Sequence, residues 1–226
     1  MGMFVPRMYR EPDPQWIREL IRRNPLALLM TNGADTEGPF GTHLPVIADP
    51  GPAAHDSPDL TGTTLLGHMN RANPQWKALR AGTPAVLSFA GPHGYVSPTL
   101  YPLTPAAPTW NYTAAQLRGV IEPVESAEET LSVVRATAGA LEAEFGNGWD
   151  MTESMGHFRR ILPGVGAFRF TVTRSEAIFK LSQEQSRETQ GRVCRHFQEA
   201  ADGQPAVAEY MSRLAGSSLE HHHHHH

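Results

Sequence analysis

Six short apolar segments of this chain have the length and alternating pattern of β-strands, and helices interrupt them in no regular order. A doubly wound α/β fold would require strand and helix to alternate along the chain. The order found here instead predicts a mainly β chain with added helices (α+β), whose sheet closes into a β-barrel. The expected strands are residues 26–31, 40–47, 61–68, 85–89, 111–124 and 165–173, the last extended by 177–181, and the expected helices are 14–23, 74–79, 127–145, 152–162 and the remainder of the chain.

The segments between these elements indicate one domain, residues 8–215, which ends in a helical C-terminal extension. Residues 49–60 are rich in Pro, Asp, Ala and Gly and are expected to form an exposed loop. Residues 91–108 are crowded with Pro, Tyr and Gly and are expected to form a long, stiff connection. The last eight residues, 219–226, are typical of an expression tag.

The charge balance disfavours a nucleic-acid surface as the main feature of the chain. The formal net charge is −4, and it becomes −3 when Glu220 of the tag is left out. Non-specific affinity for DNA comes from clustered basic groups, so direct DNA binding is not expected. Only two of the 19 basic residues are lysines, Lys77 and Lys180. Lys180 is either a retained functional cation or an ordinary surface lysine, and its position alone does not decide between them.

The single cysteine, Cys194, excludes an internal disulfide and fits a reducing compartment. His196 lies two residues further along, but the stretch is expected to be helical, so the pattern favours an idle thiol over a nucleophile. No apolar run has the length of a membrane span, and a cytoplasmic protein is expected.

Common catalytic motifs are absent from the sequence. There is no GxGxxG after a strand, no P-loop and no nucleophile elbow. The six histidines outside the tag are scattered, without ligand spacing or acidic partners, so no metal site is expected.

Polar and aromatic side chains instead gather where the expected strands end. Residues 42–45 (Thr-His-Leu-Pro) place a proline inside a strand, which either exposes backbone groups to a flat ring or marks an edge strand or bulge. Arg71 lies in a strand-to-helix turn, a favourable place for a phosphate because backbone N–H groups are free there. Taken alone, a capped helix with a surface arginine explains Arg71 better.

Two later segments add aromatic faces and a cation. Residues 91–101 either form the roof of a pocket or cover a barrel end. Trp110 and Tyr112 alternate with Asn111, so the rings face one side of a strand and the amide faces the other. An aromatic pair is usually core, but Asn111 is costly to bury without a partner. Together with Lys180, these features suit a planar phosphorylated cofactor, which needs flat walls, hydrogen-bond partners and a positive anchor.

Five ordered segments resemble the PaiB-type FMN-binding proteins, which are often labelled negative transcriptional regulators. The resemblance covers most of residues 8–190. It implies an FMN-binding split β-barrel, similar to pyridoxamine-phosphate oxidases, that works as a homodimer with its cofactor at the subunit interface. The segments are THLP (42–45), GHxxRxNPQW (67–76), GPHxYxS (91–97), PTWNY (108–112) and KLSQ (180–183).

The resemblance also implies three groups of cofactor-binding residues. Family members commonly have Asn directly after KLSQ, whereas this chain has Glu184. The difference is expected to affect the rim that faces the substrate more than flavin binding itself. His68, Asn70, Arg71 and Asn73 would surround the phosphate; Thr42, His43, Leu44 and Pro45 would line the isoalloxazine edge; Trp110, Asn111, Tyr112, Lys180, Ser182 and Gln183 would approach from the partner subunit or the far wall.

The function favoured by these features is an FMN-dependent oxidoreductase or oxidase that acts on a small organic substrate. The substrate would stack on the flavin beneath Tyr95, Tyr101 and Trp110, and NAD(P)H or oxygen would be the redox partner. His43, His68 and Tyr112 are the candidate catalytic groups for moving a proton, and the sequence does not choose among them. The alternatives are a PaiB-like negative transcriptional regulator, acting through FMN or a protein partner, and a flavin-binding module without turnover.

Overall fold

The computed structural model describes residues 2–33, 37–51, 59–200 and 203–222, which form two compact units. One unit, here called the barrel unit, comprises residues 18–89 and 115–175. The other, the extension unit, comprises residues 1–17, 90–114 and 176–226. Three long strands run without a break from one unit into the other.

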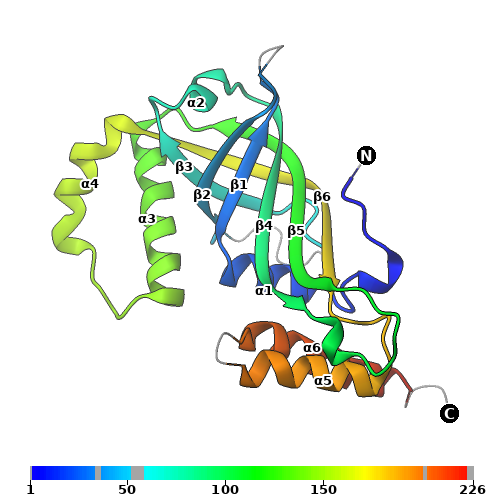
Figure 1. The fold of residues 1–226 in the computed structure, drawn as a ribbon. Helices are drawn as coiled ribbons and strands as arrows, with labels where there is room; N and C mark the ends of the chain where they lie inside the picture. The colour runs from blue at the N-terminus through cyan, green and yellow to red at the C-terminus, as the bar shows by residue number, and fades with distance from the viewer. Residues whose placement is uncertain (1, 34–36, 52–58, 201–202, 223–226) are drawn as a thin grey trace. The chain divides into compact units, whose positions relative to one another are not determined.

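Both units contain strands and helices, whose places in the fold are labelled in Figure 1. The barrel strands come from most of the length of the chain, and the last two helices follow the last strand. In chain order the elements are η1 (Arg7–Tyr9), α1 (Gln15–Arg23), β1 (Leu26–Thr31), β2 (Phe40–Ala48), β3 (Thr64–Asn70), α2 (Pro74–Ala78), β4 (Thr83–Val96), η2 (Pro98–Leu100), β5 (Thr109–Pro123), α3 (Ala127–Phe145), η3 (Thr152–Ser154), α4 (Met155–Ile161), η4 (Leu162–Gly164), β6 (Val165–Lys180), α5 (Arg187–Glu199) and α6 (Pro205–His222).

The six strands form a closed barrel in the order β1-β2-β3-β6-β5-β4. In β5, buried and more exposed residues alternate along almost the whole strand, as expected when one face of a sheet fills an interior. The interior is closely filled, because Leu29, Leu87, Leu117, Phe168 and Phe170 are all fully buried. The predicted fold class, a mainly β barrel with added helices, is confirmed.

One helix covers the outside of the barrel unit. Ser126 caps α3 by accepting a hydrogen bond from the backbone N–H of Glu129, as the sequence pattern predicts. Figure 1 shows α3 beside β3 and β2, and Val133 of α3 packs into a cluster with Ile47 of β2 and Leu66 of β3. Burial of this face holds α3 against the sheet.

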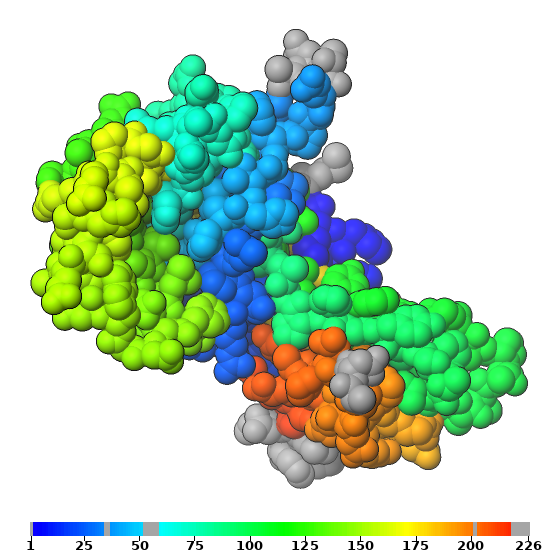
Figure 2. Space-filling model, turned by 60° about the vertical axis from the view of Figure 1, so that its left-hand side comes forward, coloured from blue at the N-terminus to red at the C-terminus, as the bar shows by residue number. Residues whose placement is uncertain are grey.

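The extension unit has its own aromatic core. The rings of Trp16, Phe179 and Tyr210 lie with their centroids 5.2–5.4 Å apart, so α1, β6 and α6 meet at one point. α5 and α6 pack against each other along their lengths. Figure 2 shows the orange surface of α5 next to the green surface of residues 97–108, where Arg192 donates a hydrogen bond to the carbonyl of Leu100.

The structure corrects several predicted boundaries. β4 continues to Val96, so residues 91–96 are strand rather than loop. This is possible because the hydroxyl of Thr113 in β5 bonds to the carbonyl of Pro92, an acceptor that proline retains. The two pieces of the last predicted strand form one strand, β6, and the strand expected to end at His68 continues to Asn70. Of the predicted loop 49–60, residues 52–58 lie outside the described residues.

The helices predicted at residues 14–23, 74–79 and 127–145 agree with α1, α2 and α3 to within one residue at each end. The helix expected at residues 152–162 consists of α4 flanked by the short 3-10 helices η3 and η4. Among the described residues, no helix is long and apolar enough to cross a membrane.

Gly119 provides a test of the barrel packing. A β-carbon at Gly119 would overlap the backbone oxygen of Thr171 and the ring of Phe170 on β6. Gly119→Ala should therefore lower the free energy of unfolding by about 1–3 kcal/mol, measured by urea denaturation. Gly156→Ala is the control, because open space surrounds Gly156, and its stability should not fall. Equal stability of both variants would contradict close packing between β5 and β6.

Candidate functional site

The barrel opens between β2 and β3. Residues 40–45 of β2 lie opposite β1, and only Val46–Ala48 lie opposite β3. β3, in contrast, pairs with β6 over its whole length. The described pairings therefore leave residues 40–45 and 68–70 without a ladder between them. Both of these segments belong to the predicted cofactor site.

The residues predicted to line the isoalloxazine edge, Thr42 to Pro45, alternate between the two faces of β2. Leu44 points into the core and is buried, whereas His43 is exposed and Thr42 and Pro45 are partly buried. Leu44 can therefore offer only its backbone to a ligand outside the barrel. Pro45, opposite Leu26 at the end of β1, lies just before the residue where pairing with β3 begins. The proline does not interrupt β2, which runs unbroken from Phe40 to Ala48, but it lies at the end of the segment that does not pair with β3.

A buried glutamine that sequence analysis missed joins α2 to β1 and β2. Gln75 of α2 is 1% exposed, and its amide donates to the carbonyl of Leu29 and to the hydroxyl of Thr31, at 3.2 and 3.1 Å. The hydroxyl of Thr42 donates to the amide oxygen of Gln75. Asn73 caps α2 and donates to the same Thr42 hydroxyl at 2.9 Å. Thr42 and Asn73 therefore join β2 to α2 through hydrogen bonds within the protein.

Arg71 lies in the turn between β3 and α2, as predicted. Its Nε donates to the carbonyl of Val165 at 2.7 Å, and its guanidinium lies 5.5 Å from the ring centroid of Trp76. Trp76 in turn lies flat on the backbone of β6, where a β-carbon at Gly166 would overlap the ring. The side chain is thus held by one nitrogen and one stacking contact, and no hydrogen bond is described for its two terminal nitrogens.

Arg71 and Trp76 line a pocket of about 500 Å³ with two further basic residues, Lys77 and Arg80. One carboxylate, that of Glu125, faces the three cations. The guanidinium of Arg80 already donates to the carbonyls of Lys77 and Leu79. The pocket can hold a small anion, with Arg71 and Lys77 as its most available donors.

His68 has a ring nitrogen that nothing in the described residues satisfies. Its Nδ1 is buried and has no hydrogen-bond partner there, whereas the carbonyl and amide groups of the same strand pair with β6. Burial lowers the pKa of His68 below its usual value, because the charged form is poorly solvated. The ring is therefore neutral at pH 7, and an unpaired buried nitrogen at this place suits a bound polar ligand.

The remaining predicted residues lie in the extension unit. On β5, Asn111 is fully buried while Trp110 is 47% exposed and Tyr112 is partly buried, so the predicted alternation holds and the amide faces inward. The Asn111 amide donates to the Ser182 hydroxyl at 3.0 Å, and Ser182 is itself fully buried. Asn111 and Ser182 thus satisfy each other inside the protein, and the buried amide has the partner that it needs.

The segment after β6 forms a tight turn. Ser182 has a φ of 71°, in the left-handed region that non-glycine residues rarely adopt. The Gln183 side chain bonds to the backbone N–H of Leu181 and to the carbonyl of Phe179, so its amide braces the turn rather than extending from it. Lys180, just before the turn, donates to the hydroxyl of Thr109 at 2.7 Å.

A polar cluster beside Lys180 was missed by sequence analysis. The hydroxyl of Tyr9 donates to the carboxylate of Glu184 at 3.0 Å, and the ammonium of Lys180 lies 5.8 Å from the Tyr9 ring centroid. Partial burial and the Glu184 carboxylate raise the pKa of Tyr9 to about 12. Burial and Glu184 raise the pKa of Tyr101 as well. Glu184 stood out in the sequence as a departure from the family pattern, but its contact with Tyr9 was not predicted.

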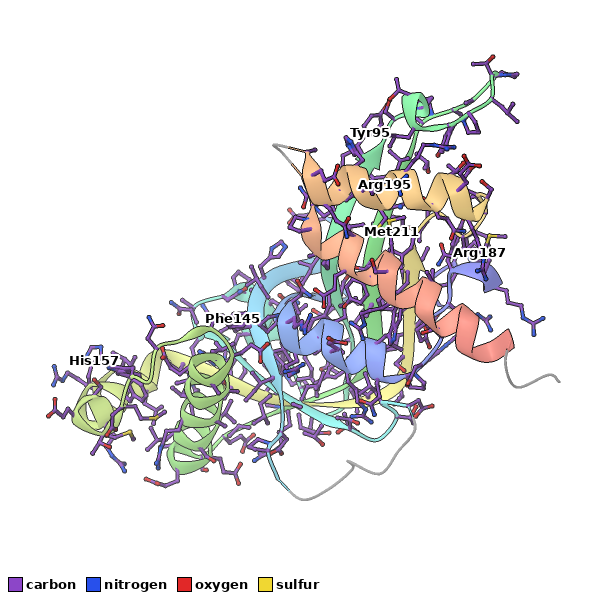
Figure 3. The ribbon with its side chains drawn as sticks, turned by 90° about the horizontal axis from the view of Figure 1, so that it is seen from below. Tyr95, Phe145, His157, Arg187, Arg195 and Met211 are labelled. Atoms are coloured by element: carbon purple, nitrogen blue, oxygen red, sulfur yellow. The ribbon has the colours of Figure 1, made fainter. Side chains whose placement is uncertain are left out.

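An exposed aromatic group occupies β4 and β5 in the same unit. The indole nitrogen of Trp110 donates to Nδ1 of His93 at 3.1 Å, and the two rings stack with centroids 5.9 Å apart. Tyr95 lies 5.7 Å from Trp110, and both rings are about half exposed. Figure 3 labels Tyr95 on β4. These rings offer a flat apolar surface to a partner or ligand.

The structure thus brings the predicted residues together as two groups. One group, in the barrel unit, contains Thr42 to Pro45 and His68 to Asn73. The other, in the extension unit, contains Trp110 to Tyr112 and Lys180 to Gln183. Within each group, side chains far apart in sequence are hydrogen-bonded to each other.

Comparison with known proteins identifies the family. Residues 3–174 match the family model described as "Putative FMN-binding domain". The chain therefore belongs to this FMN-binding family, and the predicted flavin cofactor is confirmed. The match also supports the predicted resemblance to PaiB-type proteins. Among related sequences, the Bacillus subtilis protease synthase and sporulation protein PAI 2 is 27% identical, over 81% of this chain and 84% of the relative.

Further similarity extends to fungi and to solved flavoprotein folds. An uncharacterised protein of Aspergillus fumigatus is 30% identical, over 80% of this chain and 85% of its own length. The flavocytochrome Anf3 from Azotobacter vinelandii has a similar fold, with a TM-score of 0.54 at 15% identity, over 83% of this chain and 78% of that one. A FAD and heme binding protein from Mycobacterium smegmatis has a similar fold as well, with a TM-score of 0.52 at 15% identity, over 80% of this chain and 78% of that one.

His68 allows a test of the electrostatics at the opening. Because burial lowers its pKa, its neutral form contributes stability above the unfolded pKa of about 6.5, and this contribution is lost as the pH falls through the folded pKa. Removing the tag histidines and comparing urea denaturation at pH 7.5 and 5.5 should show a smaller loss for His68→Gln than for the parent chain. His157→Gln, at an exposed position of α4, is the control and should behave like the parent. A loss in His68→Gln as large as in the parent would contradict the burial of His68.

Proposed function

We propose that this member of the FMN-binding family is an FMN-dependent oxidoreductase that acts on a small organic substrate. The observation that carries the proposal is the basic pocket beside the barrel opening. There Arg71 is held by Val165 and Trp76 with its terminal nitrogens free of described hydrogen bonds. Next to this pocket, one strand edge is unpaired and one histidine nitrogen is unsatisfied.

The phosphate of FMN would bind in the pocket of Arg71, Lys77 and Arg80. A guanidinium that is already oriented loses little freedom when it grips a phosphate in two places. The sequence also suggested help from the end of α2, but that helix has only five residues. A helix this short carries little of the dipole that favours anions, so the side chains must supply most of the attraction.

The flavin ring would lie along residues 42–45 of β2. In this segment one edge of β2 pairs with β1, and the other edge does not pair with β3. The backbone groups along that unpaired edge are therefore available to the edge of a flat ring. Thr42 and Asn73 are already committed to each other and to Gln75, and in this proposal they position β2 and the turn. His68 would bond to the cofactor through Nδ1, which accounts for a buried polar atom that is otherwise unpaired.

FMN, when bound, supplies the redox chemistry. The chain's own groups would bind the substrate, exclude water and move a proton. Trp110 and Tyr95 offer an exposed aromatic face on which a flat substrate can stack. His43, which is exposed on β2, His68 and Tyr112 remain the candidate proton carriers. His68 suits the role of acceptor, because its lowered pKa keeps the ring neutral at pH 7.

The proposal includes a homodimer with the flavin at the subunit interface. The exposed rings of Trp110 and Tyr95 and the apolar side chains of Phe4 and Leu103, all in the extension unit, are of the kind that interfaces cover. A second copy would supply the extension-unit residues, including Lys180, as the far wall of a site built on the barrel unit. Oxygen or NAD(P)H would close the catalytic cycle.

A regulatory role is the second candidate. It is favoured by the similarity to the Bacillus subtilis protein whose name refers to protease synthesis and sporulation. The net charge of −4 makes direct DNA reading a poor explanation for such a role. Regulation would instead act through a protein partner or through a small molecule sensed at the flavin.

Arg71→Ala tests the phosphate site. Loss of a charge-assisted, two-pronged contact should weaken FMN binding by about ten- to a hundredfold, measured by quenching of flavin fluorescence in a titration. Arg160→Ala, which changes an exposed arginine of α4, should leave the affinity unchanged. Equal affinities of the two variants would remove the assignment of Arg71, while FMN binding by the parent chain would still stand.

Anaerobic reduction distinguishes the proposed functions. An oxidoreductase should bind one FMN per chain, and the flavin absorbance should bleach on addition of NADH, NADPH or a substrate and return with oxygen. Trp110→Ala should slow reduction by a flat substrate at least severalfold, because stacking area is lost. Phe145→Ala, at another exposed aromatic position, is the control. Stoichiometric flavin that no reductant reaches would leave only a binding or regulatory role.

A further inference from the structure

The extension unit contains a second pocket, outside the proposed flavin-phosphate site. It has a volume of about 640 Å³ and is bounded by the N-terminal segment, the turn after β6 and the helices α5 and α6. All of its walls belong to the extension unit. Figure 3 shows Arg187 and Arg195 on α5 and Met211 on α6, the helix that lies beside it.

The charged residues that line this pocket are all basic. Three arginines line it, Arg10, Arg187 and Arg195, and no aspartate or glutamate does. None of the three takes part in an ion pair found among the described residues. Of the neighbouring carboxylates, Glu188 pairs with Arg192 and Glu184 accepts from Tyr9, whereas Glu11 interacts electrostatically with Arg10. Two arginines of this pocket, Arg187 and Arg195, therefore have no ion-pair partner among the described residues, although the net charge of the chain is −4.

The floor of the pocket is apolar. Leu181 and Met211 are buried at its base, and Met8, Leu214 and Ala215 complete the apolar wall. The amide of Gln183 is not available to a ligand, because both of its ends bond to the turn itself. A ligand would therefore meet hydrocarbon below and guanidinium groups at the rim.

We propose that this pocket is a binding site for a free amphipathic anion, with a carboxylate or phosphate head and an apolar body. The body would displace water from the floor, and the head would lie among the three guanidinium groups. Neither part is sufficient alone. Exposed ion pairs contribute little individually, and the apolar floor is too open to hold an uncharged chain firmly. The proposal does not require the flavin and stands or falls independently of it.

The single cysteine supplies a readout. Cys194 lines the pocket and is partly buried, with its Sγ 3.5 Å from the Ala208 carbonyl and from the Ser212 hydroxyl. Alkylation by iodoacetamide, which is uncharged and so does not compete for the arginines, can be followed by mass spectrometry. Because the sequence has no other cysteine, the rate reports on this pocket alone.

Octanoate and octyl phosphate should slow alkylation of Cys194 in a saturable manner. 1-Octanol, which has the same chain without the charge, and acetate, which has the charge without the chain, should protect at least severalfold less. Arg195→Gln should weaken octanoate binding about two- to fivefold, and the double change Arg187→Gln with Arg195→Gln about tenfold. Arg160→Gln, on α4 of the other unit, should leave protection unchanged.

The outcomes separate the explanations. Equal protection by octanoate and 1-octanol, or by octanoate and acetate, would overturn the proposal, as would undiminished protection in the double variant. If circular dichroism shows that a variant does not fold, the parent chain still decides the matter. Added salt should weaken the binding of octanoate to the parent chain but not the binding of 1-octanol. A parent chain whose octanoate affinity is insensitive to salt would refute the role of the arginines.

Discussion

Beside the opening of the barrel between β2 and β3, one buried amide, that of Gln75, ties α2 to β1 and β2. Residues 40–45 of β2 do not pair with β3. Beside them, the Gln75 amide donates hydrogen bonds to the carbonyl of Leu29 and the hydroxyl of Thr31 and accepts one from the hydroxyl of Thr42. Loss of the Gln75 amide would remove hydrogen bonds from both strands, at a cost of about 1–3 kcal/mol for each buried polar group left without a partner. Gln75 therefore helps to hold the unpaired strand edge in a fixed position, which is the property a flat cofactor needs.

In the extension unit, the hydrogen bond between Asn111 and Ser182 likewise holds a polar segment of backbone in place. Ser182 adopts a left-handed φ, which is unfavourable for a residue with a side chain, and the conformation is held by Asn111, Gln183 and the backbone of Phe179. The turn is thereby fixed at the end of β6, directly after Lys180. The KLSQ segment is thus best understood as a rigid support: one residue of the four offers its charge, and the others hold the backbone that carries it.

Much of the barrel could be predicted from the sequence, because apolar alternation reports directly on which residues face an interior. The strand β5 and the helix α3 were predicted within two residues of their observed ends. The continuation of β4 to Val96 was not, because Gly91-Pro92 and Gly94 are typical of a loop and only pairing with β5 makes them strand. Tertiary contacts here override local preference.

The candidate site also contains features that the sequence predicts and features that it does not. The strand-to-helix turn with Arg71, the proline within β2 and the inward Asn111 were visible in the spacing of residue types. Gln75 and the Tyr9–Glu184 pair were not, because their partners lie 33 to 175 residues away in the chain and no local pattern marks them. Glu184 was noticed only as a departure from the family, and its partner became evident only in three dimensions.

The two basic pockets differ in a way that bears on what each can bind. In the barrel unit, Arg71 is fixed by a hydrogen bond and by the Trp76 ring, and Arg80 is held by two carbonyls. In the extension unit, Arg10, Arg187 and Arg195 are exposed beside an apolar floor, and no side-chain hydrogen bond is described for them. Fixed donors favour a ligand group of one shape, such as a phosphate monoester, because little side-chain freedom is lost on binding. Free donors over hydrocarbon accept many head groups and select by the apolar body instead. The same residue type therefore provides specificity in one unit and tolerance in the other, and the difference lies in what restrains each guanidinium.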